Sequence, residues 1–131
     1  MEKTLLKLEP SPWIIKQVEI VQKRKTINIL DFASGGGRHS INLANNRRFI
    51  TAIDKDRHKL ELYKNIKNIN LICFDLERND KWPLEKESFD VIIVTNYLYR
   101  PRIRELASFL KIGGFLFYET FAVGNEKYGK P

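Results

Sequence analysis

Three successive glycines, Gly35 to Gly37, form the part of this sequence best suited to hold a ligand. Glycine has no Cβ, so its backbone adopts positive φ at little cost and its N–H groups can approach a ligand closely. A helix is expected to begin near Gly37, and the positive end of its dipole attracts a polar group to the same place. Asp31 adds a carboxylate just ahead of the glycines. The segment therefore predicts a site for a nucleotide-like ligand.

The order of residues in this loop argues against two common phosphate sites. A dinucleotide-binding loop needs G-x-G-x-x-G, but Ser40 stands in the place of the third glycine. A P-loop needs Gly-Lys-Ser/Thr after its glycines, and Arg38 follows them here instead. Asp31 would repel a pyrophosphate, whereas it suits a cationic ligand such as a sulfonium or an amino-acid ammonium group. A nicotinamide-dependent oxidoreductase is therefore the least favoured hypothesis.

Further polar side chains follow the other apolar runs of the chain. Asp54 and Asp75 each end such a run. Because open α/β sheets bind ligands beyond the carboxyl ends of their strands, we expect both carboxylates near the glycines. Asp54 is placed to accept hydrogen bonds from two ribose hydroxyls, and Asp75 from an adenine amine. Asn96 and Tyr97 follow the next run and are expected to face the group that reacts.

The elements that must position these residues alternate between strands and helices. Strands are expected at 27–32, 49–53, 69–74, 89–94 and 115–121, and helices at 37–46, 58–66 and 103–110. A further helix begins after Ser11-Pro12, an N-cap followed by proline in the first turn. Continuous apolar runs are typical of strands that are covered on both faces. The sequence therefore predicts an α/β fold with a parallel sheet of about five strands and helices on both faces.

Taken together, these motifs resemble the class I S-adenosylmethionine-dependent methyltransferases of the small single-domain type. The resemblance rests on Leu30-Asp31-x-Ala33-x-Gly35-x-Gly37-Arg38, Ile53-Asp54, Asp75-Leu76-Glu77, Phe89-Asp90-Val91-Ile92 with Thr95-Asn96-Tyr97-Leu98, and Leu110-Lys111-Ile112-Gly113-Gly114. Each segment is weak alone, but the five occur in order over residues 11–131. The resemblance implies a Rossmann-like sheet with the strand order 3-2-1-4-5.

The resemblance also implies a cofactor and a reaction. The cofactor would be S-adenosyl-L-methionine, with Gly35 and Gly37 beside its methionine part, Asp54 on its ribose and Asp75 on its adenine. The residues expected at the cofactor are Asp31, Ala33, Gly35, Gly37, Asp54, Lys55, Asp75, Leu76 and Thr95, with Asn96 and Tyr97 as candidates on the acceptor side. A sulfonium is already an activated methyl donor, so no general base is assigned. The small size of the chain favours a small-molecule acceptor.

Two departures from the family pattern affect this interpretation. Ala33 stands where the commonest first motif has glycine. The family's sheet continues past the fifth strand with two more strands, whereas this sequence stops at Pro131 and leaves 115–121 as an unprotected edge. Either that strand pairs with another subunit to form a homo-oligomer, or the chain is the N-terminal part of a longer enzyme. The alternative function is a truncated, non-catalytic S-adenosylmethionine-binding module that acts as an oligomer or partner subunit.

Composition sets the remaining expectations. The 131 residues are 43% hydrophobic and 30% charged, which is typical of one globular domain over residues 1–131. No apolar run approaches the roughly 20 residues of a membrane span, so no membrane partner is expected. The N-terminus lacks the features of a secretion signal, which predicts a cytoplasmic protein. The net charge of +7 allows RNA as a partner, although the basic residues are scattered.

Five single residues carry smaller predictions. Cys73 is the only cysteine, so no internal disulfide forms, and it is expected to be buried in its strand. His39 and His58 lack clustered acids, so no metal site is expected, and His39 should be solvated. Trp13 is expected in the helix core, and Trp82 as an anchor for its loop.

Overall fold

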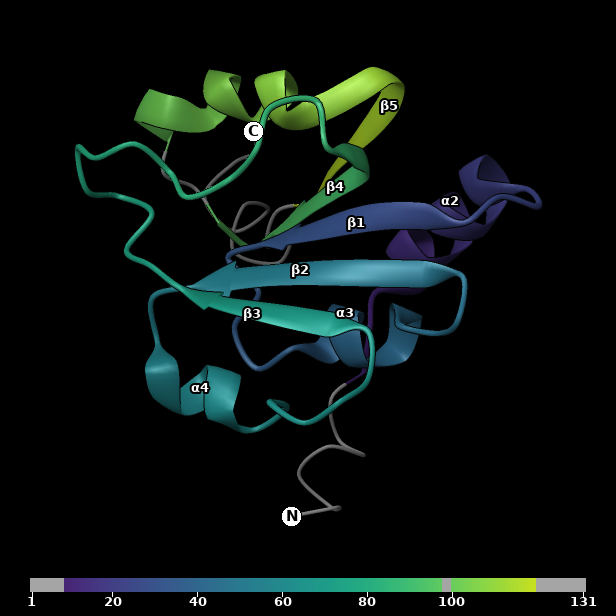
Figure 1. Cartoon of the computed structure of the whole chain (residues 1–131), viewed down its shortest axis with the longest axis horizontal. Coiled ribbons are helices and arrows are strands. Elements are labelled where there is room, and N and C mark those ends of the chain that lie inside the picture. The colour runs from purple at the N-terminus through teal and green to yellow at the C-terminus, as the bar shows by residue number, and fades with distance from the viewer. Residues whose placement is uncertain (1–8, 98–99, 120–131) are drawn as a thin grey trace, which may run out of the picture.

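The computed structural model describes residues 9–97 and 100–119, which are built around one parallel β-sheet (Figure 1). Its strands are β1 (Ile27–Phe32), β2 (Arg48–Asp54), β3 (Ile69–Cys73), β4 (Phe89–Thr95) and β5 (Leu110–Glu119). They lie in the order β3-β2-β1-β4-β5, which confirms the predicted order. Phe32 at the end of β1 lies opposite Ile53 of β2 and Val94 of β4. The carboxyl ends of these three strands therefore meet at one edge of the sheet.

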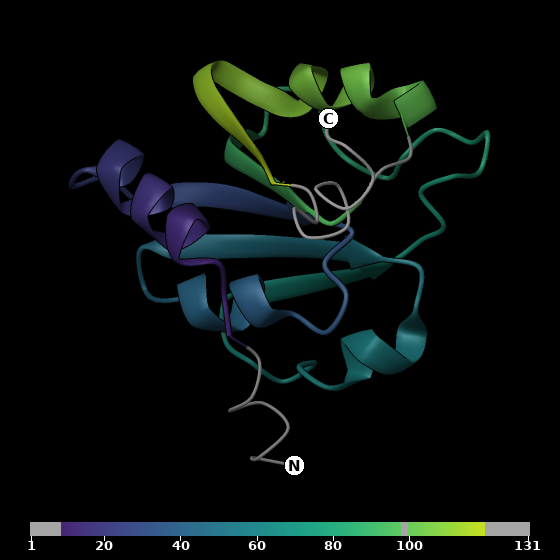
Figure 2. The same cartoon turned by 180° about the vertical axis from the view of Figure 1, so that it is seen from behind.

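Helices cover both faces of the sheet, as predicted, but the two faces are covered differently (Figures 1 and 2). The helices are α2 (Pro12–Gln22), α3 (Arg38–Leu43), α4 (Arg57–Glu61) and the 3₁₀ helix η1 (Arg100–Phe109). Ile14 of α2 packs in one core cluster with Ile29 of β1. Leu106 of η1 packs in another with Leu30 of β1. Since successive residues of a strand point to opposite faces, α2 and η1 lie on opposite sides of the sheet.

The helices of the first face share that side for the same reason. The core cluster of Ile14 and Ile29 also includes Leu43 of α3. Leu60 of α4 packs with Ala52 of β2, which points to the same side as Ile50 in the first cluster. All three α-helices therefore cover one face, and η1 lies on the other.

The helices begin where capping residues predict but are shorter than expected. The Ser11 hydroxyl accepts from the Ile14 N–H at 3.3 Å and starts α2. Asp56 caps α4 in the same way, one residue before the helix begins. The predicted helices 37–46 and 58–66 are both too long, since α3 ends at Leu43 and α4 at Glu61. None of the helices in the described ranges is both long and apolar enough to cross a membrane.

β5 is an edge strand with exposed apolar side chains. It begins at Leu110, earlier than the predicted 115, and residues 120–121 of the prediction lie outside the described residues. Within the described residues it pairs with β4 alone. Ile112 is 96% exposed and Phe115 45% exposed. This edge therefore has the open character that the sequence predicts.

The segment between β3 and β4, residues 74–88, crosses the second face of the sheet without forming a helix. Trp82 holds it in place, because its indole N–H donates to the Leu76 carbonyl at 3.0 Å and its ring packs against Phe32 and Phe109. This confirms Trp82 as the anchor of its loop. The segment covers the carboxyl half of the face and leaves part of the strands open.

Two side chains expected in the core lie at the surface instead. Trp13 is 44% exposed, because it points from α2 toward β5, where its ring meets Phe117 edge-on at 5.8 Å. Cys73 is exposed because it ends β3, which is the other edge strand. The predictions that Trp13 belongs to the helix core and that Cys73 is buried are therefore wrong.

Candidate functional site

Two adjoining cavities lie beside the glycine loop, residues 33–37, where β1, β2 and β4 end. Their volumes are about 370 Å³ and about 270 Å³. The larger is lined by Ala33, Ser34, Gly35, Gly36, Arg38, Asp54, Lys59, Thr95, Asn96 and Tyr97. The smaller is lined by Ala33, Asp54, Lys55, Asp56, Lys59, Asp75, Leu76, Glu77 and Tyr97. Four residues line both cavities, so the two form one continuous cleft.

The loop has an unusual backbone. Ala33, Gly35 and Gly37 have φ of 61°, 57° and 84°, all in the left-handed region. An L-residue with a side chain is strained there by about 1–2 kcal/mol, which explains why the commonest family motif has glycine in place of Ala33. The Ser34 N–H donates to the Ile53 carbonyl at 3.0 Å, so the loop is attached directly to the end of β2.

Asp54 is the carboxylate that this arrangement places at the centre of the cleft. Its Oδ1 accepts from the Gly35 N–H at 3.1 Å, and its Oδ2 accepts from the Asp56 N–H at 2.9 Å. Asp54 is half-buried and lines both cavities. Because a carboxylate has about four acceptor positions, each oxygen can still accept a hydroxyl from a ligand.

Asp31 lies behind the loop and lines neither cavity. Its side chain is buried, and its Oδ2 accepts from the Ser40 hydroxyl at 2.7 Å. Burial raises the pKa of the Asp31 carboxyl to about 6, although the hydrogen bond from Ser40 opposes this shift. The geometry favours a role for Asp31 in attaching α3 to β1, rather than the contact with a ligand ammonium group that the sequence also allowed.

Most of the other predicted residues reach the cleft. Lys55, Asp75 and Leu76 line the smaller cavity, and Thr95 lines the larger. One oxygen of Asp75 also accepts from the Glu77 N–H at 3.0 Å, so one of its hydrogen-bond acceptor positions is used to cap the following turn. Gly37, like Asp31, lies outside both linings.

The acceptor-side candidates Asn96 and Tyr97 line the larger cavity together with Asp54 and lie just beyond β4. Asn96 is exposed, has φ of 54°, and donates its backbone N–H to the Glu119 carbonyl at 2.9 Å. The Tyr97 ring packs edge-on against Phe32 at 5.6 Å. Tyr118 donates its hydroxyl to the Tyr97 carbonyl. This wall is therefore fixed to the end of β5.

Two cations in the cleft were missed by the sequence analysis. Arg38 lines the larger cavity, and Lys59 lines both. Arg38 directly follows Gly37, the N-cap of α3, and Lys59 lies in the first turn of α4, after its N-cap Asp56. Their positions at the starts of helices next to the predicted site were the signal that could have identified them. They bring positive charge to a cleft whose central acid is Asp54.

His39 is buried, so the prediction that it is solvated is wrong. Its Nε2 accepts from the Ser11 N–H at 3.0 Å, which joins α3 to the start of α2. Burial, assisted by the charge of Arg38, lowers the pKa of His39 to about 4. The ring is therefore neutral at pH 7. Within residues 9–97 and 100–119, no group of three or more His, Cys, Asp or Glu side chains could hold a metal ion.

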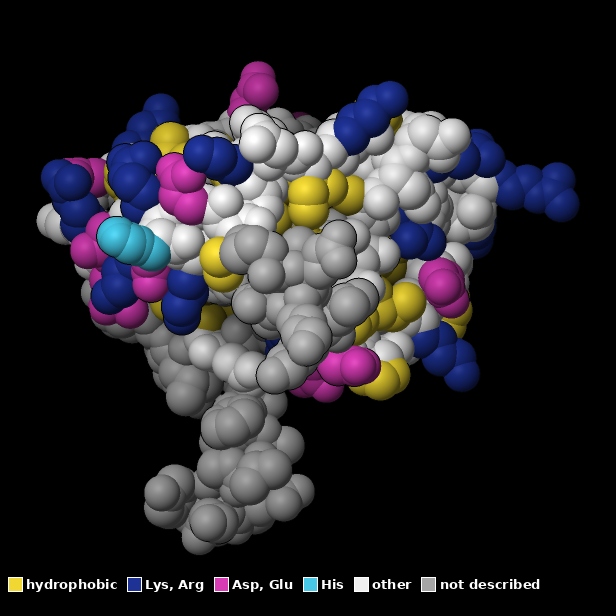
Figure 3. Space-filling model, turned by 90° about the horizontal axis from the view of Figure 1, so that it is seen from below, with side chains coloured by type: hydrophobic (Ala, Val, Ile, Leu, Met, Phe, Trp, Pro, Cys, Tyr) yellow, Lys and Arg dark blue, Asp and Glu magenta, His cyan; other side chains and the backbone are white. Residues whose placement is uncertain are grey.

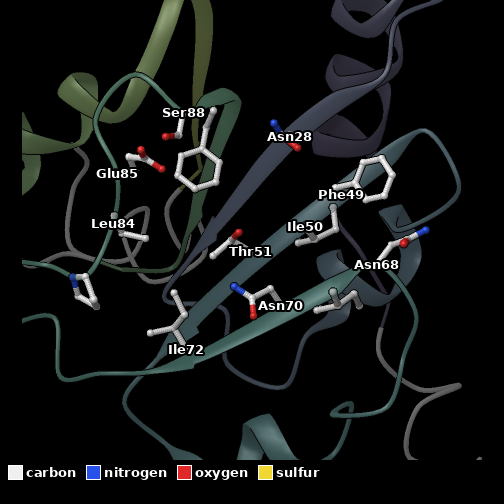
Figure 4. A pocket seen from close by; sticks show the side chains of 13 residues that line it. Asn28, Phe49, Ile50, Thr51, Asn68, Asn70, Ile72, Leu84, Glu85 and Ser88 are labelled. Carbon is white, nitrogen blue, oxygen red and sulfur yellow. The ribbon is translucent and has the colours of Figure 1, made fainter.

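Another hollow lies away from the loop, on the open part of the second sheet face. It has a volume of about 570 Å³, and polar side chains from β1, β2 and β3 project into it, among them Asn28, Thr51 and Asn70 (Figure 4). We call it the sheet-face groove. Viewed from below, the described residues show Lys and Arg side chains spread among Asp and Glu (Figure 3).

Comparison with known proteins shows which family this chain resembles. The methyltransferase domain family matches residues 29–114. Ubiquinone biosynthesis O-methyltransferase of Coxiella burnetii is 29% identical over 120 residues, which are 84% of this chain and 50% of that protein. The chain thus spans about half the length of the curated relatives it matches.

Solved structures agree on the fold. A candidate S-adenosyl-L-methionine-dependent methyltransferase of Methanococcus maripaludis superimposes with a TM-score of 0.70 at 26% identity, over 95% of this chain and 61% of that one. Coclaurine N-methyltransferase, solved with N-methylheliamine and SAH, superimposes with a TM-score of 0.65 at 18% identity, over 81% of this chain and 34% of that one. Since the family match covers more than half of a chain whose sheet has the same strand order, this chain belongs to the class I S-adenosylmethionine-dependent methyltransferases.

Proposed function

We propose that the cleft binds S-adenosyl-L-methionine and that the protein transfers the methyl group of this cofactor to a small-molecule acceptor. The observation that carries the proposal is the position of Asp54, whose carboxylate accepts from the Gly35 N–H and opens into both cavities. In this role Asp54 accepts hydrogen bonds from the ribose hydroxyls. The chain acts as one cofactor-binding unit over residues 1–131.

The residues of the cleft fit the chemistry of this cofactor. A Cβ built on Gly35 would meet no atom within 4 Å, so the loop is open on the side where a ligand would lie. Arg38 and Lys59 supply positive charge for the cofactor carboxylate, and Asp75 with Leu76 supplies the adenine end. The bound cofactor brings a methyl group on a sulfonium, which is an activated donor. The protein's own task is to orient the acceptor and exclude water.

The acceptor is expected at the wall formed by Asn96 and Tyr97. These residues line the larger cavity together with Asp54. The relatives from Coxiella burnetii are O-methyltransferases of ubiquinone biosynthesis, which favours a small molecule with a reactive oxygen. Asn96 and Tyr97 orient this acceptor, and no general base is assigned.

Calorimetric titration of S-adenosylhomocysteine into the chain tests the cofactor site. Replacing Asp54 with Asn should weaken binding about tenfold to a hundredfold, because hydrogen bonds to a charged group contribute about 1.5–3 kcal/mol. Asp80→Asn makes the same chemical change at an exposed residue that lines neither cavity, so it should bind as the native chain does. Equal affinity of the Asp54→Asn and native proteins would contradict the assignment.

A second measurement separates the enzyme from the alternative, a non-catalytic binding module. The native chain is incubated with S-adenosylmethionine and a panel of small phenols, and S-adenosylhomocysteine is quantified. Production that depends on one acceptor supports the transferase. Cofactor binding with no turnover on any acceptor favours the module, in which a partner subunit completes the site.

Two further partners are proposed in second place. A homo-oligomer would form through β5, whose apolar edge exposes Ile112, Phe115 and Leu116. RNA would meet the exposed cations Lys23 and Arg24, neither of which belongs to an ion pair found among the described residues. Analytical ultracentrifugation with and without single-stranded RNA measures both. We also place the protein in the cytoplasm, which fractionation of cells would test.

A further inference from the structure

Tyr63 lies directly beneath the glycine loop, although it belongs to the turn after α4. Its side chain is 1% exposed. Its hydroxyl shares a hydrogen bond of 2.7 Å with the Ser34 hydroxyl and donates to the Gly35 carbonyl at 3.4 Å. Burial raises the pKa of the Tyr63 hydroxyl, so it stays protonated and able to donate. One side chain thus contacts two consecutive residues of the loop.

The ring of Tyr63 also limits what can stand at position 37. A Cβ built on Gly37 would lie 2.6 Å from two carbons of that ring, closer than any real contact. The ring therefore requires glycine at this position independently of the backbone angle. From the other side, the Gly35 N–H donates to Asp54. The loop is consequently held between Tyr63 and Asp54.

We propose that Tyr63 is a positioning residue for the cofactor site, which acts through Ser34 and Gly35 to hold the glycine loop in its binding conformation before the ligand arrives. Tyr63 lines neither cavity, so it acts without touching the ligand. A loop that is already ordered loses less conformational entropy on binding. The inference rests on the proposed function, because it takes the loop to be the cofactor site.

Tyr63→Phe tests the inference, because it removes the hydroxyl and keeps the ring that packs under Gly37. The affinity for S-adenosylhomocysteine should fall at least about fivefold, as expected for the loss of the 2.7 Å hydrogen bond to Ser34 together with the longer bond to Gly35. Ser34→Ala should weaken binding as well. Adding Tyr63→Phe to Ser34→Ala should then have a smaller effect than Tyr63→Phe alone, since both changes remove the Ser34–Tyr63 bond and only the longer bond to the Gly35 carbonyl remains to be lost.

A matched control distinguishes positioning from general destabilisation. Leu60 is buried in the same core cluster as Tyr63 but makes no side-chain hydrogen bond to the loop. Leu60→Val should lower the melting temperature and leave the affinity unchanged. If Leu60→Val weakens binding as much as Tyr63→Phe does, or if Tyr63→Phe binds as tightly as the native chain, the positioning role is overturned.

A measurement on the ligand-free protein keeps this test separate from the proposed function. The amides of Gly35 and Gly37 are hydrogen-bonded to Asp54 and to the Ser34 carbonyl, so their hydrogen exchange reports the order of the loop. Tyr63→Phe should speed exchange at both amides and leave Ile92 in β4 unchanged. A native chain that binds no cofactor would refute the proposed function, while this exchange would still decide the role of Tyr63. Unchanged exchange at Gly35 and Gly37 would refute that role.

Discussion

The glycine-loop cleft and the sheet-face groove are two hollows of opposite construction. The groove, at about 570 Å³, is larger than either cavity of the cleft, which measure about 370 Å³ and about 270 Å³. Three regular strands supply its floor, where Thr51 lies directly opposite Asn70 (Figure 4). The cleft is built instead on three residues with positive φ and lies in front of a buried carboxylate, that of Asp31.

This difference shows that volume alone does not identify the functional site. Positive φ at Ala33 and burial of an acid both cost free energy, and a loop joining a strand to a helix requires neither. Such features are typical of ligand-binding sites. They persist only where the surrounding structure holds the strained backbone and the buried acid in place. The groove shares only the first of these features, at Asn68 with a φ of 69°, and the one acid in its lining, Glu85, is exposed.

The largest effect is expected from a side chain added beneath the loop. Gly37→Ala should lower the free energy of unfolding by about 4 kcal/mol, from the left-handed backbone together with overpacking against Tyr63. Gly35→Ala is the control, since it has positive φ but meets no atom within 4 Å, and it should cost only about 1 kcal/mol. Urea denaturation measures both variants. Equal losses would show that Tyr63 does not restrict position 37.

Two buried groups near the loop, Asp31 and His39, should change the free energy of unfolding in opposite directions as the pH changes. The folded-state pKa of Asp31 is raised to about 6, so its contribution to stability is complete below pH 4 and is lost as pH rises through 6. The folded-state pKa of His39 is lowered from 6.5 to about 4, so its contribution is complete above pH 6.5 and is lost as pH falls through 4. In the native chain the two effects nearly cancel.

Single variants should therefore reveal opposite slopes between pH 4 and 6.5. In Asp31→Asn the free energy of unfolding should rise with pH by about 3 kcal/mol, and in His39→Gln it should fall by a similar amount. Urea denaturation at several pH values measures this. Parallel slopes in the two variants would exclude the assignment of these pKa shifts.

A smaller gain is expected from relieving strain in the loop. Ala33→Gly removes a side chain from a φ of 61°. The relief of about 1–2 kcal/mol is partly offset by the greater entropy of the unfolded chain, which leaves a net stabilisation of about 0.5–1 kcal/mol. The melting temperature should rise, and a lower value would mean that the Ala33 methyl group contributes more to packing than its strain costs.

The smallest effect is expected in the groove. Asn70→Ala changes an exposed side chain on a regular edge strand, so stability should change by no more than about 0.5 kcal/mol. Affinity for S-adenosylhomocysteine should equal that of the native chain. Weaker binding would show that the groove and the cleft are coupled, and would contradict the assignment of ligand binding to the cleft alone.

Sequence patterns anticipated the strands of this protein better than its helix ends or its single side chains. Runs such as 89–94 are apolar on both faces, and this signal is local enough to be seen without a structure. The α3 and α4 helices end early, because the backbone at Ala44 turns extended and the chain after Glu61 continues in turns. The expectations for Trp13 and His39 failed because helical spacing does not show which neighbours will cover a side chain.

By itself the sequence determined the parallel sheet, its strand order through the family resemblance, and the placement of Asp54 at the end of β2. The sheet and the position of Asp54 depend on periodicity and on glycine and proline, whose effects act over a few residues, whereas the strand order is what the family resemblance implied. Only the tertiary structure decided that Tyr63 meets Ser34, 29 residues away, and that His39 meets Ser11, 28 residues away. Such contacts depend on how each connection crosses the sheet and on the register in which its strands pair, so no local pattern specifies them.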